Sequence, residues 1–128
     1  MGTLENQKIT SFTQLNAWKR GHELVLLIYK FTQVFPESEK FGLASQLRRA
    51  AISITSNIAE GFYRSFKKEK KQFYSISLSS VAEVQSQLLV ARDVGYLAAD
   101  KFNEATEDSI IVHKLINGLI KSVSNRPQ

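Results

Sequence analysis

The stretch from residue 41 to residue 64 constrains the fold more than any other part of the chain. Its apolar and small residues recur at alternating steps of four and three, the spacing of a helix face that packs against other helices. These positions are Leu43, Leu47, Ala50, Ile54, Ile58 and Gly61. A second stripe, formed by Ala51, Thr55, Ala59 and Phe62, widens the face. The pattern predicts a helix that other helices enclose on most sides.

Four polar side chains interrupt this apolar stretch: Arg49, Ser53, Asn57 and Glu60. Burying such groups without partners is costly, so we expect them to hydrogen-bond to one another or to a neighbouring element, as a structural polar network. Arg49 and Glu60 are eleven residues apart, which is about 16 Å along a helix axis. They therefore cannot touch within one subunit and make no catalytic pair there.

The same stretch carries a family resemblance. The run QLRRA followed by SNIAEG, with FPESEKFGL before it and a basic segment after it, resembles the 23S rRNA intervening-sequence protein family, also called the four helix bundle protein family. The similarity covers about residues 11 to 123. Beyond the central stretch it is carried by Phe12, Leu15, Trp18, Leu24, Tyr29, Glu83, Gln87, Leu88, Ala91, Gly95, Tyr96 and Leu97. The chain departs from the family at Ser79 and Ser80, where relatives often have a small pair with glycine.

The resemblance implies a four-helix bundle that assembles as a homopentamer. Members of the family are encoded within intervening sequences of 23S rRNA genes. The fold is shared with the accessory proteins of diversity-generating retroelements, which are basic pentameric bundles that bind nucleic acid and their reverse transcriptase. RNA or DNA, and a reverse transcriptase, are therefore the partners that the resemblance suggests.

Length and composition predict one globular domain without covalent staples. A chain of 128 residues buries roughly two thirds of its unfolded surface on folding. It contains no cysteine, which rules out disulfides and thiolate metal ligands and fits a reducing cytoplasm. The first residues include no long apolar run, so we expect neither a signal peptide nor a membrane span. We accordingly expect a cytoplasmic protein that has no membrane contact.

Four helical segments joined by short connections predict an all-α, up-down-up-down antiparallel four-helix bundle. The bundle is expected over residues 11–124, between a flexible N-terminal arm (1–10) and a C-terminal tail (125–128). Ser11 or Asn16 should cap the first helix and Pro36 should end it. Gly95 should stop the third helix, and the fourth should start near Ala99.

The apolar faces are wider than one small bundle needs. The third helix is expected to place Phe66, Phe73, Ile76, Val84, Leu88 and Ala91 on its main apolar face. Five apolar residues cannot all point inward, namely Phe66, Tyr74, Leu78, Ile111 and Ile120. Exposed apolar surface of this extent predicts an interface between subunits.

The net charge of +5 is unevenly distributed along the predicted bundle. If each helix is divided at its middle, one end has eleven cations and four anions, and the other has six cations and eight anions. The densest run is RSFKKEKK, residues 64–71. Cations near a helix N-terminus oppose the helix dipole, so helix stability does not explain them. A polyanion such as RNA or DNA would explain them.

The candidate nucleic-acid-binding residues are Lys19, Arg20, Arg64, Lys67, Lys68, Lys70, Lys71 and Lys121. Lysine predominates, which favours contacts to phosphates over readout of base identity. The competing interpretation of the run is an ordinary solvated face.

The sequence argues against an enzyme. The only histidines are His22 and His113, and the positions three residues before them hold Lys19 and Ile110. The Glu-x-x-His pairs of a di-iron bundle are therefore missing. Phosphate-binding glycine loops and the HExxH and GxSxG motifs are also missing. We expect no catalytic residue, no metal and no cofactor.

Two functional hypotheses remain. The first is a non-enzymatic, oligomeric nucleic-acid-binding protein, for which the family resemblance suggests a role as an accessory protein of a retroelement reverse transcriptase. The alternative is a protein-interaction scaffold that has no direct role with nucleic acid and uses its apolar flank and polarised ends to hold another protein.

Overall fold

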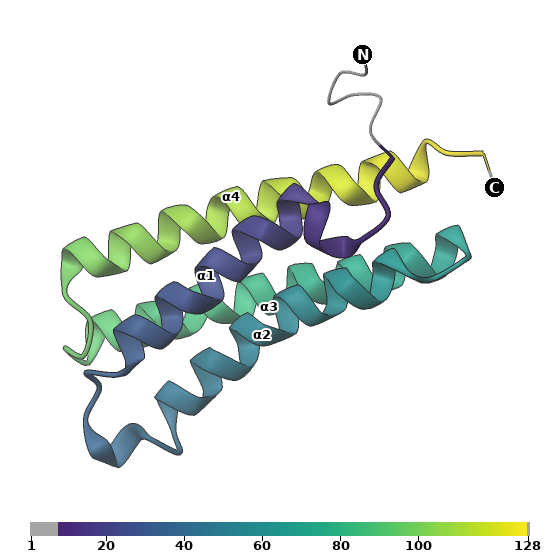
Figure 1. Cartoon of the computed structure of the whole chain (residues 1–128). Coiled ribbons are helices and arrows are strands. Elements are labelled where there is room, and N and C mark those ends of the chain that lie inside the picture. Colours follow the sequence, from purple (N-terminus) through teal and green to yellow (C-terminus); the bar gives the residue numbers. More distant parts are fainter. Residues whose placement is uncertain (1–7, 128) are drawn as a thin grey trace.

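The computed structural model describes residues 8–127 and contains four α-helices (Figure 1). These are α1 (Asn16–Thr32), α2 (Leu43–Phe62), α3 (Lys67–Asp93) and α4 (Ala99–Ser124). Two short 3-10 turns, η2 (Phe12–Gln14) and η3 (Glu37–Glu39), precede α1 and α2. Residues 8–127 form no strand, which confirms the all-α prediction. The arm predicted for residues 1–10 falls mostly on residues 1–7, which lie outside the described residues, as does the last residue of the predicted tail.

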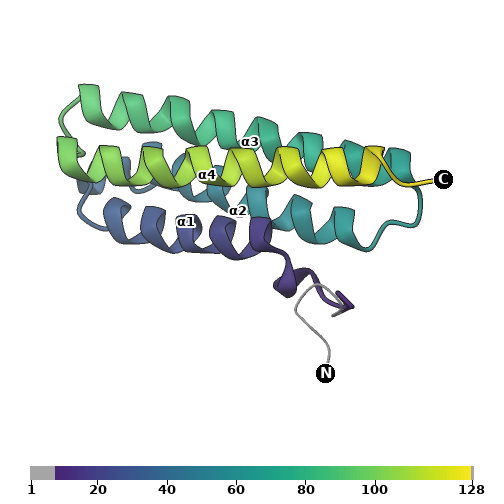
Figure 2. The same cartoon turned by 90° about the horizontal axis from the view of Figure 1, so that it is seen from above.

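Each helix packs against two others, α2 against α1 and α3, and α4 against α3 and α1. The connections alternate between the ends of the bundle (Figures 1 and 2). Those between α1 and α2 and between α3 and α4 lie at one end. The α2–α3 connection lies at the other end, together with the last turn of α4. Residues far apart in the sequence therefore meet at each end.

The core surrounds α2 as its spacing predicts. Leu47, Ile54 and Ile58 are fully buried, and Leu43 packs against the core from a partly buried position. The predicted face of α3 is wrong in part, because Ile76 is 43% exposed and Phe66 is 62% exposed. Ser77 and Ser80 are buried in α3.

The two serines are tolerated in the core because both hydroxyls are satisfied. Ser77 Oγ donates to the backbone carbonyl of Ile54 on α2 at 2.8 Å, and Ser80 Oγ donates to Ser53 Oγ at 2.8 Å. A short side chain with a satisfied hydroxyl lets the α3 backbone approach α2 more closely than isoleucine would allow.

Some of the predicted helix ends are confirmed and others are wrong. Ser11 caps η2 rather than α1, and α1 ends at Thr32, four residues before Pro36. The chain already turns at this point, where the Phe35 N–H donates to the Thr32 carbonyl. Gly95 ends α3 as predicted, because its φ of +88° suits glycine and the N–H of Tyr96 reaches back to the Ala91 carbonyl at 2.9 Å. Helix α4 begins at Ala99, also as predicted.

Glu39 joins the two connections at the end opposite the α2–α3 turn. Its Oε1 accepts a hydrogen bond from the Leu43 N–H at 3.0 Å, and its Oε2 accepts one from the Tyr96 hydroxyl at 3.1 Å. The hydrogen bond to Glu39 is the main cause that raises the pKa of Tyr96. One carboxylate thus pairs with the first turn of α2 and with the chain after α3.

Apolar side chains also lie on the outside of the bundle. Of the five residues predicted not to fit inside together, Phe66 and Ile111 are exposed, Leu78 and Ile120 are partly buried, and Tyr74 is buried. Leu26 and Ile52 add to the exposed apolar surface. No helix within residues 8–127 combines the length and the apolar character that crossing a membrane requires.

A close approach between α2 and α3 at Gly61 yields a stability prediction. A Cβ at Gly61 would lie 2.7 Å from Tyr74 Cε1 and 3.1 Å from Phe73 Cβ, whereas a Cβ at Gly118 would meet no atom within 4 Å. We expect Gly61→Ala to lower the free energy of unfolding, because overpacking costs about 1–3 kcal/mol. The matched control Gly118→Ala should raise it by up to about 1 kcal/mol through helix propensity. Chemical denaturation measures both, and a stabilised Gly61→Ala variant would contradict the packing described.

Candidate nucleic-acid interface

Most of the predicted cations gather at the end of the bundle where α2 ends, α3 begins and α4 ends (Figure 1). Lys67 Nζ donates to the Arg126 carbonyl at 2.8 Å, which joins the start of α3 to the residues after α4. We call this surface the basic end, and it comprises Arg64, Lys67, Lys68, Lys70, Lys71, Lys121 and Arg126. Only Glu60 and Glu69 supply carboxylates on the same helix turns. Arg126 is the member that the predicted set of binding residues omitted.

Lys70 has a structural role within the basic end. Its Nζ donates to the backbone carbonyls of Gly61 at 3.3 Å and Phe62 at 2.5 Å, in the last turn of α2. The Gly61 carbonyl also accepts the Arg64 N–H at 3.3 Å, so the cation adds hydrogen bonds at the end of α2 and interacts favourably with the helix dipole. Burial, and secondly the charge of Arg126, lower the pKa of Lys70. Lys70 therefore holds the start of α3 to the end of α2 and is less available to a ligand.

The other cations of the basic end differ in how firmly they are held. The Arg64 guanidinium lies 4.6 Å from the centroid of the Phe73 ring. Lys68 and Lys121 are exposed and Lys71 is partly exposed. No hydrogen bond or ion pair within residues 8–127 engages these three ammonium groups. They can turn toward an anion without losing a hydrogen bond or an ion pair.

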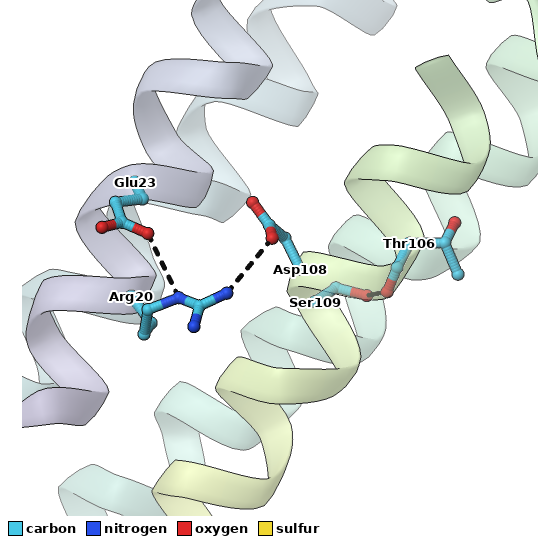
Figure 3. Close-up of polar contacts among 5 residues, drawn as sticks. All are labelled: Arg20, Glu23, Thr106, Asp108 and Ser109. Carbon is cyan, nitrogen blue, oxygen red and sulfur yellow. Dashed lines mark hydrogen bonds and ion pairs between the residues drawn. The ribbon is translucent and has the colours of Figure 1, made fainter. Parts of the chain in front are cut away.

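Arg20 does not belong to the basic end. Its guanidinium pairs with Glu23 at 3.1 Å and with Asp108 of α4 at 3.4 Å (Figure 3). Helix α1 has 17 residues and α4 has 26, so the start of α1 lies beside the middle of α4. The division of each helix at its middle therefore wrongly placed Arg20 and Asp108 at opposite ends. Lys19 lines a surface hollow with Arg20 and Glu23, on the same α1–α4 side.

A hollow of about 430 Å³ opens beside the basic end, where α1 does not reach. It is lined by Ile9, Leu15, Phe62, Lys70, Tyr74, Leu119, Val123 and Arg126. Burial raises the pKa of Tyr74, although Arg126 opposes this shift. A tyrosine phenol is protonated at neutral pH even without this shift, so the Tyr74 hydroxyl can donate a hydrogen bond.

The predicted polar network exists in part. Asn57 Nδ2 donates to the Ser53 carbonyl at 2.8 Å and to Ser53 Oγ at 3.1 Å, and Ser80 of α3 completes the cluster. Arg49 and Glu60 take no part in it, because both lie on the exposed side of α2. Their polar groups face solvent, so burial does not require them to be paired.

In the part of the chain that the structure describes, the histidines and carboxylates show no arrangement typical of a metal site. His22 stacks on Trp18 with ring centroids 4.7 Å apart, and His113 is exposed on α4. Among residues 8–127, no group of three or more histidine, aspartate or glutamate side chains is placed to hold a metal ion.

On α4, Ser109 Oγ donates to the Thr106 carbonyl at 2.7 Å, a contact within the helix (Figure 3).

Sequence reasoning missed a second cationic surface, at the end opposite the basic end. Lys40, Arg48 and Arg49 line an open groove together with Tyr29 and Phe41. When each helix was divided at its middle, these cations fell at the end whose net charge is negative. The sum over that end concealed that they cluster. The adjacent arginines in the run QLRRA were the available signal.

These features define a small all-α bundle with one strongly cationic end. The chain belongs to the 23S rRNA-intervening sequence protein family, whose sequence model matches residues 13–118, and the resemblance seen in the sequence is thereby confirmed.

A solved structure of similar fold is a protein of unknown function from the S23 ribosomal protein family of Bacteroides thetaiotaomicron. It is 23% identical to this chain with a TM-score of 0.74, and the match covers 82% of this chain and 98% of that chain. At this identity, the likeness shows the fold alone. No curated protein matches the sequence.

The coupling between Lys70 and Arg126 can be tested by titration. Replacing Arg126 by Gln should raise the pKa of Lys70, because it removes a nearby positive charge that disfavours the protonated amine. Lys121→Gln is the control, since it removes a cation from the same surface that is not a cause of the Lys70 shift. NMR titration of the lysine side chains gives the comparison. An equal rise in both variants would mean that overall charge, rather than Arg126, lowers the pKa of Lys70.

Proposed function

We propose that the protein is a non-enzymatic, oligomeric nucleic-acid-binding protein of the cytoplasm, and that its basic end contacts the phosphates of RNA or DNA. The observation that carries the proposal is the set of uncommitted lysines, Lys68, Lys71 and Lys121, at one end of the bundle. Clustered cations raise the local concentration of a polyanion and gain affinity by releasing its counterions.

Lysine chemistry indicates the kind of contact. An ammonium group on a flexible stem acts as a point charge, whereas readout of guanine favours the planar fork of arginine. Arg64, the one arginine in the run, already rests against Phe73. We therefore propose phosphate contacts with little preference for base sequence, and no catalytic role or cofactor for this end.

The proposal includes assembly into a homopentamer of up-down-up-down antiparallel bundles. The alternating connections support the antiparallel arrangement (Figures 1 and 2). Exposed apolar side chains, among them Leu26 and Ile76, support a buried interface between copies. The number five rests on the resemblance to the family. Assembly would repeat the basic end by symmetry and so increase its charge.

The same apolar side chains favour a second candidate function, a scaffold that holds another protein. A reverse transcriptase is the partner that the resemblance suggests. A scaffold without a direct role with nucleic acid would leave Lys68 and Lys71 without a function, which is why we place it second.

The dependence of binding on salt tests the role of the basic end. We expect the double variant Lys68→Gln, Lys71→Gln to reduce the slope of log K against log salt by about 1.4–1.8, since each phosphate contact contributes about 0.7–0.9. Lys30→Gln, Lys101→Gln removes the same charge from exposed residues near the opposite end. Fluorescence anisotropy with short RNA and DNA measures both. Equal slopes for the two double variants would show that the lysine run is an ordinary solvated face and does not bind nucleic acid.

The oligomeric state requires its own measurement. Light scattering coupled to size exclusion should give a mass five times that of the 14.5 kDa chain. A monomer at micromolar concentration would contradict the subunit interface, and a dimer would leave the interface but exclude the pentamer.

A further inference from the structure

We propose that a groove between α1 and α2 is a second site, which binds single-stranded RNA or DNA by stacking a base on Phe41 and contacting phosphate through Arg48 and Arg49. The α1–α2 groove is open to solvent, has a volume of about 450 Å³ and is lined by Tyr29, Lys40, Phe41, Ser45, Arg48, Arg49 and Ile52. This volume lies within the range of ligand sites, roughly 300–1,000 Å³. The groove lies at the opposite end of the bundle from the basic end.

Arg48 is held in place before any ligand arrives. Its Nε donates to Thr32 Oγ1 at 2.8 Å, and Thr32, which is 4% exposed, donates in turn to the Ile28 carbonyl at 2.7 Å. The guanidinium also stacks on Tyr29, 4.6 Å from the ring centroid. Within residues 8–127, only Nε of Arg48 takes part in a hydrogen bond. The two terminal nitrogens of its guanidinium are therefore available to an anion.

Every charged residue that lines the groove is a cation. Lys40, Arg48 and Arg49 form no ion pair within residues 8–127, and no carboxylate lines the groove. Glu37 lines an adjoining hollow with Lys40 and Arg48, but no carboxylate compensates the charge inside the groove itself. An anionic group entering the groove would gain attraction from all three side chains.

Phe41 supplies a flat apolar surface beside these charges. The residue is 90% exposed, and Lys40 Nζ lies 5.6 Å from the ring centroid. A cationic groove with an exposed aromatic ring is the combination by which proteins hold single strands, because any unpaired base can stack on the ring. In a duplex the base faces are already stacked on one another, so Phe41 would gain nothing there.

The lining argues against a protein segment as occupant. An amphipathic helix needs a continuous apolar trench, and Ile52 is the only aliphatic residue that lines the groove. Aromatic rings and guanidinium planes predominate instead, and these suit bases and phosphates.

This inference rests on the proposed affinity for nucleic acid but uses a different surface. The basic end offers mobile lysines to any phosphate backbone. The α1–α2 groove adds a contact that only an unpaired base can make, and so it predicts a preference for single strands over duplexes.

The test compares Phe41→Ala and Arg49→Gln with the controls Val34→Ala and Lys30→Gln. Val34 is 76% exposed and does not line the groove, so its truncation matches that of Phe41 in exposure. The probes are a labelled 12-nucleotide strand and the duplex of the same sequence, titrated at one fixed salt concentration. We expect Phe41→Ala to weaken binding of the single strand by about 5- to 150-fold and binding of the duplex by less than about twofold. Arg49→Gln should weaken single-strand binding as well, and the controls should change neither.

A direct readout of stacking comes from Phe41→Trp. Its fluorescence, taken as the difference from the parent protein that contains Trp18, should be quenched by the single strand and not by the duplex. Equal losses for strand and duplex in Phe41→Ala, or no loss, would overturn the proposal. So would groove variants that change the oligomeric mass but not the affinity, because the groove would then be a subunit contact.

The two proposals fail in different ways. If the Lys68, Lys71 double variant binds like the parent while Phe41→Ala loses only single-strand affinity, the proposal for the basic end is wrong and the proposal for the groove is supported. If the lysine variant alone loses affinity, for both probes, the groove is wrong and the basic end stands. A parent protein that binds neither probe overturns both.

Discussion

Close packing of α3 on α2 is the constraint on which the rest of this bundle depends. Helix α2 has other helices on most of its circumference, and its small residues, such as Ala50 and Ala51, are buried together with its large ones. Gly61 lets the Tyr74 ring lie where a side chain would otherwise stand. The Ser77 hydroxyl donates a hydrogen bond to an α2 carbonyl. Such close contact depends on the shape of the side chains as well as on apolar area, so one added methyl group destabilises the packing.

That packing also determines the geometry of the basic end. The turn that joins α2 to α3 lies at the end of the bundle (Figure 2), and the lysines that follow it belong to the first residues of α3. Lys70 strengthens the junction by donating to the last carbonyls of α2. One lysine of the run is thereby used for structure, and its neighbours Lys68 and Lys71 stay exposed or partly exposed. The run thus serves two purposes that its composition alone does not distinguish.

The sequence predicted the features that depend on local chemistry. The periodicity identified Leu47, Ile54 and Ile58 as core residues, and Gly95 stopped α3 because only glycine readily adopts its φ. Hydrophobicity could not identify Ser77 as buried, because its place in the core depends on a carbonyl supplied by another helix.

The position of Arg20 was missed for a different reason. It depends on the unequal lengths of α1 and α4, and a division of each helix at its middle ignores the offset between them. The α1–α2 groove was missed because its residues come from two helices and the connection between them. The family and the fold could therefore be read from the sequence, whereas the distribution of charge needed the tertiary arrangement.

The two cationic surfaces differ in the physics of their side chains. At the basic end, lysines are point charges on flexible stems, and their attraction to phosphate weakens as salt screens it. In the α1–α2 groove, Arg48 is fixed by Thr32 and Tyr29, so less conformational entropy is lost when it meets a ligand. Stacking on Phe41 depends on apolar contact, which salt does not screen. Contact with the groove should therefore persist at salt concentrations that already release the basic end, and the preference for single strands should grow as salt is raised.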